Sequence, residues 1–366
     1  MKIAHITMSF FPAAGGQEAY IIELNKILND AGHEISVIQP RRPFSGKKPK
    51  NVIFTPHSRF IHRLGTGFDW FWFNFMLLFY KKFLNSQDIL ICHYPFHLPS
   101  IKWHKNIIVL SHGVDWPNNP KILFDKLKLK NAKISFESNL KIVANDTDFA
   151  ERHGKIFTKE PFFFQSYKNL WVIPNCVDTE KFNYSDEIKN NIVLLPRNIR
   201  KSRGIDLAIK AFNIFQKKHQ DYKMLIAGMP LKGDYYNTCT KLIKENDLID
   251  KVIFIGHQNQ NDLIELYKTS KITLIPSTAY EGTSLSALES MACRTPVVST
   301  KVGGLKDLPS FKSDVNEFDL SKSMNYVEEN WQLESKRQFN ETREKFNLIN
   351  WKNAWLNVLD SPAENK

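Results

Sequence analysis

Two glutamates stand eight positions apart, Glu281 and Glu289, and a run of small residues lies between them. A strand predicted over 271–275 ends shortly before Glu281, and a helix is predicted to begin near Ser284, so Glu289 lies about one turn inside that helix. The first amides of a helix have no partner within the helix and suit a phosphate group. Glu281 and Glu289 would then accept hydrogen bonds from hydroxyl groups on either side of the phosphate. The residues whose amides would bind it are Gly282, Thr283, Ser284 and Leu285.

A nucleotide diphosphate-sugar offers a sugar, a diphosphate and a ribose in that order. Glu281 would contact the sugar and Glu289 the ribose. A purely structural alternative stays open for Glu289. Ser286 and Glu289 have the spacing of a capping box, in which the glutamate would hold the start of its own helix.

A basic loop follows the strand predicted over 191–195. It holds four cations within seven residues, Arg197, Arg200, Lys201 and Arg203. Such cations bind phosphate oxygens, and arginine does so through two parallel hydrogen bonds. The loop therefore predicts a clamp for a diphosphate, and an ordinary solvated loop is the alternative.

Two further motifs lie in the N-terminal half. Gly15 and Gly16 follow the first predicted strand, 2–7, where glycine lets backbone amides approach a phosphate closely. This turn lacks G-x-G-x-x-G, which counts against a dinucleotide-dependent oxidoreductase. His112 directly follows the strand predicted over 107–110. It is a candidate active-site imidazole, and an ordinary surface or core histidine is the alternative.

The elements that must position these groups alternate between apolar strands and helices, which predicts parallel sheets covered on both faces. The pattern restarts after residue 190, and residues 172–186 look like the crossover between two domains. The predicted fold class is α/β, with two doubly wound Rossmann-like domains facing each other across a cleft. Ligands of such sheets bind beyond the carboxyl ends of the strands, and each motif above follows a strand end. The strands are predicted over 2–7, 34–38, 88–92, 107–110, 141–144, 191–195, 223–227, 251–255, 271–275 and 296–299.

The predicted domain boundaries are 1–173 for the N-terminal, acceptor-side domain and 174–349 for the C-terminal, donor-binding domain. We expect the last helix, at about 350–366, to pack back on the first domain. A chain of 366 residues has the length of two such domains, and its 42% hydrophobic and 24% charged residues are typical of a soluble globular protein.

The net charge of +12 is unevenly distributed. Up to residue 174 the chain holds 23 Lys/Arg against 13 Asp/Glu, and beyond it 27 against 25. An anionic partner of the first half is one interpretation, and ordinary solubility is the other. No recognised nucleic-acid module is visible, so we do not expect a nucleic-acid partner. The four cysteines form no C-x-x-C pair, which predicts reduced thiols and no zinc site.

An aromatic segment, Phe68 to Leu84, is the most apolar part of the chain. Asp69 and the pair Lys81 and Lys82 bracket it, so its uncharged core is too short to span a bilayer. It is either a core helix or a helix at a membrane surface. Polar residues interrupt the apolar N-terminus, so we expect no signal peptide.

The C-terminal half resembles the retaining glycosyltransferases of family 4, also called glycosyl transferases group 1, which have the GT-B fold. The resemblance covers nearly the whole chain and is weaker over 40–105 and after 310. It rests on VIPNCVDTEKF (172–182), LPRNIRKSRGIDLAIKAF (195–212), FIGHQNQNDLIELYKTSKITLIPS (254–277) and EGTSLSALESMACRTPVVSTKVGG (281–304).

The resemblance implies roles for single residues. The last segment carries the family's E-x7-E pattern, in which Glu281 would contact the donor sugar and Glu289 the nucleotide ribose. Arg197 matches the family's diphosphate arginine. The family usually has a lysine just before the glycine of this loop, where this chain has Arg203, so either Arg203 or nearby Lys201 would supply the second cation.

Gly15, Gly16 and His112 match the family's glycine loop and active-site histidine less specifically. The resemblance implies transfer of a sugar with retention, by same-face attack in which the leaving phosphate takes the acceptor proton. Cationic side chains would replace a metal, and no cofactor is expected. Among these residues His112, Glu281 and Arg197 would be catalytic.

Two alternatives share this architecture: a sugar-nucleotide 2-epimerase, which needs no acceptor, and a non-catalytic nucleotide-sugar-binding protein. The basic, aromatic N-terminal half suits a lipid-linked or oligosaccharide acceptor at a membrane surface. The expected context is assembly of a bacterial surface polysaccharide, such as lipopolysaccharide, capsule or exopolysaccharide. The expected location is the cytoplasm, with peripheral attachment to the inner face of its membrane.

Overall fold

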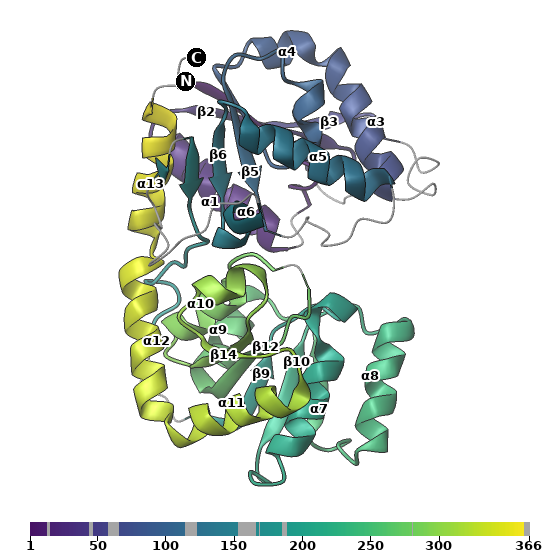
Figure 1. Cartoon of the computed structure of the whole chain (residues 1–366), viewed down its shortest axis with the longest axis vertical. Helices are drawn as coiled ribbons and strands as arrows, with labels where there is room; N and C mark the ends of the chain where they lie inside the picture. Colours follow the sequence, from purple (N-terminus) through teal and green to yellow (C-terminus); the bar gives the residue numbers. More distant parts are fainter. Residues whose placement is uncertain are drawn as a thin grey trace. The chain divides into compact units, whose positions relative to one another are not determined.

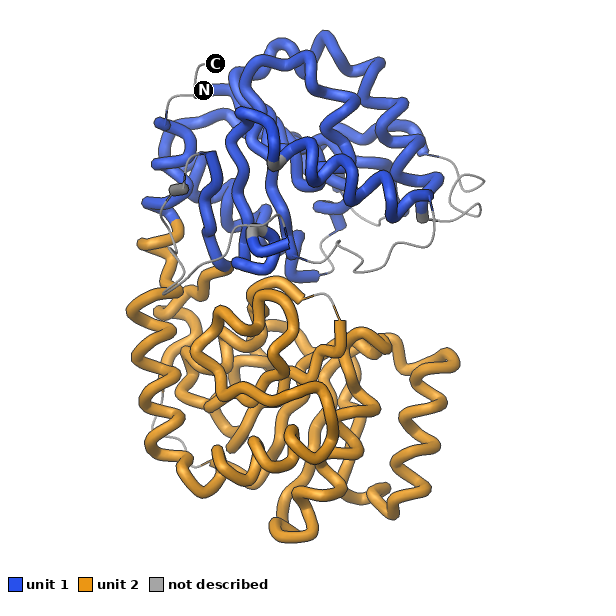
Figure 2. The backbone as a smooth tube through the Cα atoms, in the orientation of Figure 1, with its two compact units in different colours: residues 1–174, 352–366 blue, residues 175–351 orange. Residues whose placement is uncertain are grey.

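The computed structural model describes residues 1–12, 15–43, 47–57, 66–113, 123–152, 166–167, 169–184, 189–279 and 281–361. The chain divides into two compact units (Figure 2). Unit 1 comprises residues 1–174 and 352–366, and unit 2 comprises residues 175–351. The end of the predicted last helix, 362–366, lies outside the described residues.

Unit 1 contains an eight-stranded sheet in the order β3-β2-β1-β4-β5-β6-β8-β7 (Figure 1). All neighbouring strands are parallel except β7 and β8. The strands are β1 (Lys2–Ile6), β2 (Glu34–Pro40), β3 (Val52–Thr55), β4 (Ile89–Cys92), β5 (Ile107–Ser111), β6 (Lys141–Ala144), β7 (Ser166–Tyr167) and β8 (Leu170–Val172). The helices are α1 (Gly16–Asp30), α3 (Thr66–Phe79), α4 (Lys81–Asn85), η1 (Pro95–Ser100), α5 (Leu123–Glu137) and α6 (Thr147–Arg152).

Unit 2 contains a six-stranded parallel sheet in the order β11-β10-β9-β12-β13-β14. The strands are β9 (Asn190–Leu195), β10 (Lys223–Ala227), β11 (Val252–Gly256), β12 (Ser270–Ile275), β13 (Val297–Thr300) and β14 (Phe311–Ser313). The helices are η2 (Lys201–Arg203), α7 (Ile205–Phe215), α8 (Asp234–Glu245), α9 (Gln260–Thr269), α10 (Leu285–Ala292), η3 (Gly303–Asp307), α11 (Glu317–Glu329), α12 (Trp331–Lys345) and α13 (Leu348–Asp360). The chain returns to unit 1 within α13.

Both sheets have the same winding. In unit 1 the chain moves outward from β1 to β3 and then returns to place β4 on the other side of β1; in unit 2, β9 and β12 repeat this arrangement. A doubly wound sheet changes direction at such a switch point, and ligands bind beyond the strand ends there. The predicted fold class, two parallel α/β units, is confirmed.

The core of unit 2 shows why its helices form. Helix α7 carries the predicted apolar stripe, and Ala208, Ala211, Phe212 and Phe215 on it are fully buried. They share a hydrophobic cluster with side chains of α8 and α11, whereas α10 packs against α9 and α12. Helices therefore cover both faces of the sheet, and the strands between them are apolar on both sides.

Four strands were not predicted from the sequence. β3, β7, β8 and β14 each have only two to four residues, and two of the three residues of β14 are lysine and serine, so no periodicity marks these strands. The predicted aromatic helix is divided in two: α3 ends at Phe79, and the short α4 follows with Tyr80 as its N-cap. Among the described residues, no helix reaches the length and apolarity that crossing a membrane requires.

Candidate functional site

The predicted site residues of unit 2 meet at the switch point of its sheet. Arg197 lies two residues beyond β9, and Ser277 and Glu281 follow β12, the strand beside β9. Arg197 is buried and donates hydrogen bonds to Ser277 Oγ at 3.1 Å and to Ser284 Oγ at 3.4 Å. Strand ends that are 78 or more residues apart in sequence thus place their polar side chains in one cluster.

Glu281 is the centre of this cluster. Its Oε2 is ion-paired with both Arg197 Nη2 and Arg203 Nη1, and Ser277 Oγ donates to the same oxygen at 2.7 Å. The side chains of Arg197 and Glu281 are each 8% exposed, and that of Arg203 is 24% exposed. Two guanidinium groups around one carboxylate leave an excess positive charge, which favours an anionic ligand.

Burial acts on both arginines. It lowers the pKa of Arg197 to about 10. Burial, together with the positive charges of Arg197 and Arg200, lowers the pKa of Arg203 to about 9. Both groups therefore stay charged at neutral pH. A further anion beside them would relieve their repulsion and raise both pKa values.

The other two cations of the basic loop lie apart from this cluster. Lys201 and Arg200 are exposed. The backbone carbonyl of Lys201 accepts a hydrogen bond from Thr278 Oγ1 at 3.3 Å, and no ion pair of its ammonium group occurs among the described residues. Of the two candidates for the second cation, the structure brings Arg203 to Glu281.

The predicted helix start is at the predicted place. Ser284 is the N-cap of α10, and its hydroxyl accepts from Arg197 instead of capping a helix amide. Leu285 is the first helical residue, and Gly282 and Thr283 are buried in the loop before it. The first-turn amides of α10 therefore have no side-chain cap and remain suited to an anion.

Close backbone contacts fix this loop. The amide of Asn175 donates to Thr283 Oγ1 at 2.7 Å, and the amide of Gly304 donates to the carbonyl of Glu281 at 2.7 Å. Gly303 has φ of +53°, and a Cβ there would lie 2.2 Å from the same carbonyl oxygen. Gly204 has φ of +67°, and a Cβ there would lie 2.0 Å from the carbonyl oxygen of Pro276. Only glycine fits these two positions.

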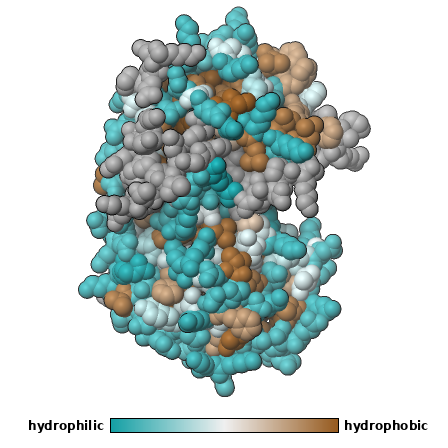
Figure 3. Space-filling view, in the orientation of Figure 1, coloured by the Kyte–Doolittle hydropathy of each residue, from teal (hydrophilic) through white to brown (hydrophobic). Residues whose placement is uncertain are grey.

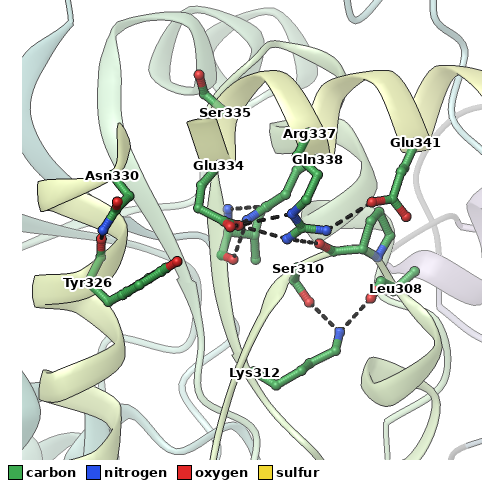
Figure 4. A network of polar contacts seen from close by, with 12 residues as sticks. Leu308, Ser310, Lys312, Tyr326, Asn330, Glu334, Ser335, Arg337, Gln338 and Glu341 are labelled. Atoms are coloured by element: carbon green, nitrogen blue, oxygen red, sulfur yellow. Dashed lines mark hydrogen bonds and ion pairs between the residues drawn. The ribbon is translucent and has the colours of Figure 1, made fainter. Parts of the chain in front are cut away.

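A partly buried polar network holds the segment that carries Gly304 (Figure 4). Lys312 Nζ donates to the carbonyls of Leu305 and Leu308, at 2.6 and 2.5 Å, and thereby secures η3. Arg337 of α12 donates to the carbonyl of Pro309 at 2.9 Å and to Glu334 at 2.7 Å. The loop behind Glu281 is thus attached to β14 and α12.

Glu289 does not occupy the helix position that a capping box requires. Because Ser284 is the N-cap of α10, Glu289 is the fifth helical residue, too far along to reach back to the helix start. The capping-box alternative is therefore wrong. Instead, Tyr267 of α9 donates to Glu289 Oε2 at 3.0 Å. Burial raises the pKa of Glu289 to about 7, and the Tyr267 hydrogen bond and the charge of Lys181 partly oppose this.

The remaining predicted residues belong to unit 1. Gly15 is the N-cap of α1 with an extended backbone, and Gly16 is the first residue of that helix. His112 directly follows β5 and lies 3.0 Å, Nε2 to Nδ1, from His93. Among the described residues, no group of three or more His, Cys, Asp or Glu side chains is arranged to hold a metal ion.

The sequence did not single out several residues that shape the site: Ser277, Tyr267, Asn175, Gly204 and Gly303. The glycine pair after β13 and the glycine before α7 were visible signals, because a glycine at a strand–helix turn indicates close backbone approach. Ser277 and Tyr267 had no such signal, since only the packing of β12 and α9 turns them toward the glutamates.

Comparisons with known proteins identify the family and the fold of this chain. The family described as Glycosyl transferases group 1 matches residues 177–345, and Glycosyltransferase Family 4 matches residues 14–181. An uncharacterised glycosyltransferase of Methanocaldococcus jannaschii is 33% identical over 37% of this chain and 34% of its own length. N-acetyl-alpha-D-glucosaminyl L-malate synthase of Bacillus anthracis is 25% identical over 83% of this chain and 80% of its own.

This chain therefore spans about a third of the length of the first of these relatives and most of the length of the second. Among solved structures, HepE of Anabaena in complex with UDP superimposes with a TM-score of 0.75 at 16% identity, over 99% of this chain and 100% of HepE. The two family matches together extend from residue 14 to residue 345, and the fold agrees with them. The chain belongs to the family 4 type of glycosyltransferases with the GT-B fold.

Proposed function

We propose that this protein moves a sugar from a nucleotide diphosphate-sugar to an acceptor hydroxyl with retention of configuration. The observation that carries the proposal is the convergence of Arg197 and Arg203 on Glu281, beside the uncapped start of α10. The arginines and the first-turn amides of α10 supply positive charge for a diphosphate. Glu281 and Glu289 supply acceptors for hydroxyl groups on either side of it.

Charge stabilisation is the main contribution of this site. When the bond between the sugar C1 and the diphosphate oxygen breaks, negative charge grows on the diphosphate. Preorganised cations that face this charge in a dry site lower the barrier, and loss of one such group slows the reaction by about 100- to 1,000-fold. The acceptor oxygen forms its bond to C1 on the same face, and its proton passes to the leaving phosphate oxygen. In this scheme the arginines stabilise the negative charge of the diphosphate, as a metal ion does in other enzymes, and no cofactor takes part.

The arrangement also assigns a ligand-dependent role to Glu281. Without donor, its carboxylate offsets part of the positive charge of the two arginines. A bound diphosphate supplies two or more negative charges to the same guanidinium groups. The carboxylate is then available to accept hydrogen bonds from hydroxyls of the donor sugar, as the ribose hydroxyls would bind Glu289.

The donor can be tested directly. We propose a UDP-sugar as the first candidate, because HepE, which has a similar fold, was solved with UDP. A thermal-shift screen should compare UDP, GDP, ADP and CMP with their sugar conjugates. A ligand at 100 times its Kd adds about 2.7 kcal/mol to the free energy of unfolding.

Turnover then separates the alternatives. A transferase releases nucleotide diphosphate only when an acceptor is present. An epimerase would convert the donor sugar without any acceptor, and a binding protein would show the melting shift with neither product. Failure of every nucleotide to stabilise the protein would refute the proposed donor site.

For the acceptor, we propose a lipid-linked saccharide at the inner face of the cytoplasmic membrane, as used in surface polysaccharide assembly. One face of α3 is buried through Trp70, Phe73 and Leu77. Large apolar side chains on its other face are exposed, at positions 68, 71, 75, 78 and 79, of which Phe79 is 68% exposed. Figure 3 shows hydrophobic residues on the same side of unit 1 as α3.

Spacings of three and four residues place these side chains in one stripe along the helix, and the exposed Lys81 and Lys82 follow it. An apolar stripe with adjacent lysines suits the boundary of an anionic membrane. Replacement of Phe75 and Phe79 by serine should abolish cosedimentation with phosphatidylglycerol vesicles. The matched control is Phe318→Ser, since Phe318 is 71% exposed on α11 of unit 2. Equal binding of both variants would refute attachment through α3.

A further inference from the structure

Three histidines of unit 1 form one hydrogen-bonded chain. His5 is on β1, His93 directly follows β4, and His112 directly follows β5. His5 Nδ1 lies 2.8 Å from His93 Nε2, and His93 Nδ1 lies 3.0 Å from His112 Nε2. His5 and His93 are fully buried and His112 is 8% exposed. The chain therefore runs from the interior of the sheet to its carboxyl edge, at the switch point of unit 1.

The register of the sheet produces this alignment. Strands β1, β4 and β5 are neighbours, and His5 pairs with Ile91 while the amide of His93 donates to the carbonyl of Ile6 at 3.0 Å. The rings of His93 and His112 are stacked, with centroids 5.2 Å apart and planes 13° apart. The backbone carbonyl of His112 accepts from Asn145 Nδ2 at 3.1 Å. The three imidazoles are therefore held in place by backbone contacts as well as by each other.

The three hydrogen-bonded histidines allow only two arrangements of their ring protons. Burial lowers the pKa of His5 and of His112 to about 3, and lowers that of His93 well below the usual value, so all three rings are neutral. A neutral imidazole has one donor nitrogen and one acceptor nitrogen. Each of the two hydrogen bonds needs one of each kind. Either all three protons are on Nδ1 or all three are on Nε2.

The buried end of the chain favours one arrangement. His5 Nε2 is buried and has no hydrogen-bond partner among the described residues. Buried N–H groups without an acceptor are rarer in proteins than buried acceptors that lack a donor. The proton of His5 is therefore on Nδ1, which donates to His93. His93 in turn donates from Nδ1 to His112 Nε2.

We propose that His5 and His93 are positioning residues that fix His112 as a neutral donor, with its proton on Nδ1. This nitrogen lies at the outer end of the three-histidine chain and takes part in neither of its two hydrogen bonds. It would donate to an oxygen of the donor sugar and could not accept a proton there. The contact with substrate rests on the proposed function, whereas the tautomer does not.

The first test is a long-range ¹H–¹⁵N correlation spectrum of the full-length protein with ¹⁵N-labelled histidine, near pH 7. It distinguishes the two nitrogens of each ring and needs no activity. Signals of the three histidines are assigned by single substitutions. We expect His5, His93 and His112 all to carry the proton on Nδ1. A His112 protonated on Nε2 would overturn the proposal.

Two variants of the buried end test the coupling. His5→Asn keeps an N–H donor close to the position of Nδ1, whereas His5→Leu removes it. We expect His112 to keep its tautomer in His5→Asn and to lose its single tautomer in His5→Leu. His97→Leu is the matched control, because His97 is a buried histidine of the same unit that forms a hydrogen bond with Asn74 and not with His5, His93 or His112. An unchanged His112 tautomer in folded His5→Leu would overturn the positioning role.

Kinetics provide the functional readout. His5→Leu should raise the donor KM or lower kcat by roughly 2- to 10-fold, the usual effect of one neutral hydrogen bond. His5→Asn should restore most of this loss. The melting shift caused by UDP should stay as in the wild type, because unit 2 binds the nucleotide in the proposed function. Normal kinetics in a His5→Leu protein with an altered His112 tautomer would overturn the substrate contact. Absence of transfer in the wild type would instead refute the proposed function, and the spectrum would still decide the tautomer.

Discussion

Replacement of Glu281 by glutamine removes the one negative charge that the two arginines share. The carboxylate and Arg197 are each 8% exposed, so neither side chain is solvated by bulk water. Removal of one partner from a buried ion pair lowers the free energy of unfolding by about 3–5 kcal/mol. The glutamine can still accept one hydrogen bond from a guanidinium group, so we expect the lower end, about 3 kcal/mol. The melting temperature of unit 2 should therefore fall by about 6–12 °C.

The same variant should keep its affinity for nucleotide diphosphates or bind them more tightly. The diphosphate would replace the missing carboxylate between Arg197 and Arg203, and no charge of Glu281 would repel it. Differential scanning calorimetry with and without UDP, together with titration calorimetry, measures both effects. We expect a larger UDP-induced melting shift in Glu281→Gln than in the wild type, and transfer activity that is reduced at least 100-fold because the sugar contact is lost.

Glu334→Gln is the matched control. Glu334 is a buried carboxylate of the same unit, paired with Arg337 and bonded to Gln338 at 3.0 Å. Its replacement should lower stability to a similar extent and leave nucleotide affinity unchanged. Two results would refute the reasoning about Glu281. One is an unchanged melting temperature, and the other is loss of UDP binding, which would mean that the arginines do not face the diphosphate.

Four further predictions concern the same unit. Since burial raises the pKa of Glu289 to about 7, its carboxyl group is mostly protonated at pH 6 and mostly ionised at pH 8. If only the ionised form accepts hydrogen bonds from both ribose hydroxyls, the Kd of the nucleotide-sugar should fall about 10-fold over this range. A Kd of the wild type that does not change with pH would contradict this prediction. For the same reason this group makes the free energy of unfolding decrease as pH rises from about 4.5 to 7, because the folded state retains a proton that the unfolded state has lost, and Glu289→Gln should remove this decrease in urea titrations. Arg203→Ala should raise the Kd of UDP by about 10- to 100-fold, whereas Lys201→Ala should raise it by less than about 2-fold. Equal effects of the two substitutions in titration calorimetry would contradict the assignment of Arg203 as the second diphosphate-binding cation. Gly303→Ala, with φ of +53° and a carbonyl oxygen 2.2 Å from the new Cβ, should lower the free energy of unfolding by about 1–3 kcal/mol, which chemical denaturation would measure.

The sequence determined the fold class and most of the strands. The strands over 141–144 and 223–227 have the predicted bounds, and most of the others differ by one or two residues. Long buried strands of parallel sheets are continuous apolar runs, so their position can be seen locally. The start of α10 could be predicted for the same reason, since a small polar residue before an apolar periodic segment marks a helix N-terminus.

Only the tertiary structure decided how the functional side chains interact. The sequence placed two cations within reach of the diphosphate site, but the left-handed turn at Gly204 and the approach of η2 to β12 bring Arg203 to Glu281 and leave Lys201 exposed. Likewise, the spacing of Ser286 and Glu289 allowed a capping box, and the actual helix start at Ser284 excludes it. His93, the hydrogen-bond partner of His112, is 19 residues away in sequence, and His5, the partner of His93, is 88 residues from His93, so no local pattern indicates these contacts. Contacts between distant strand ends depend on the order and register of the strands, which a single sequence does not show. These contacts determine the charge around Glu281, the pKa of Glu289 and the tautomer of His112.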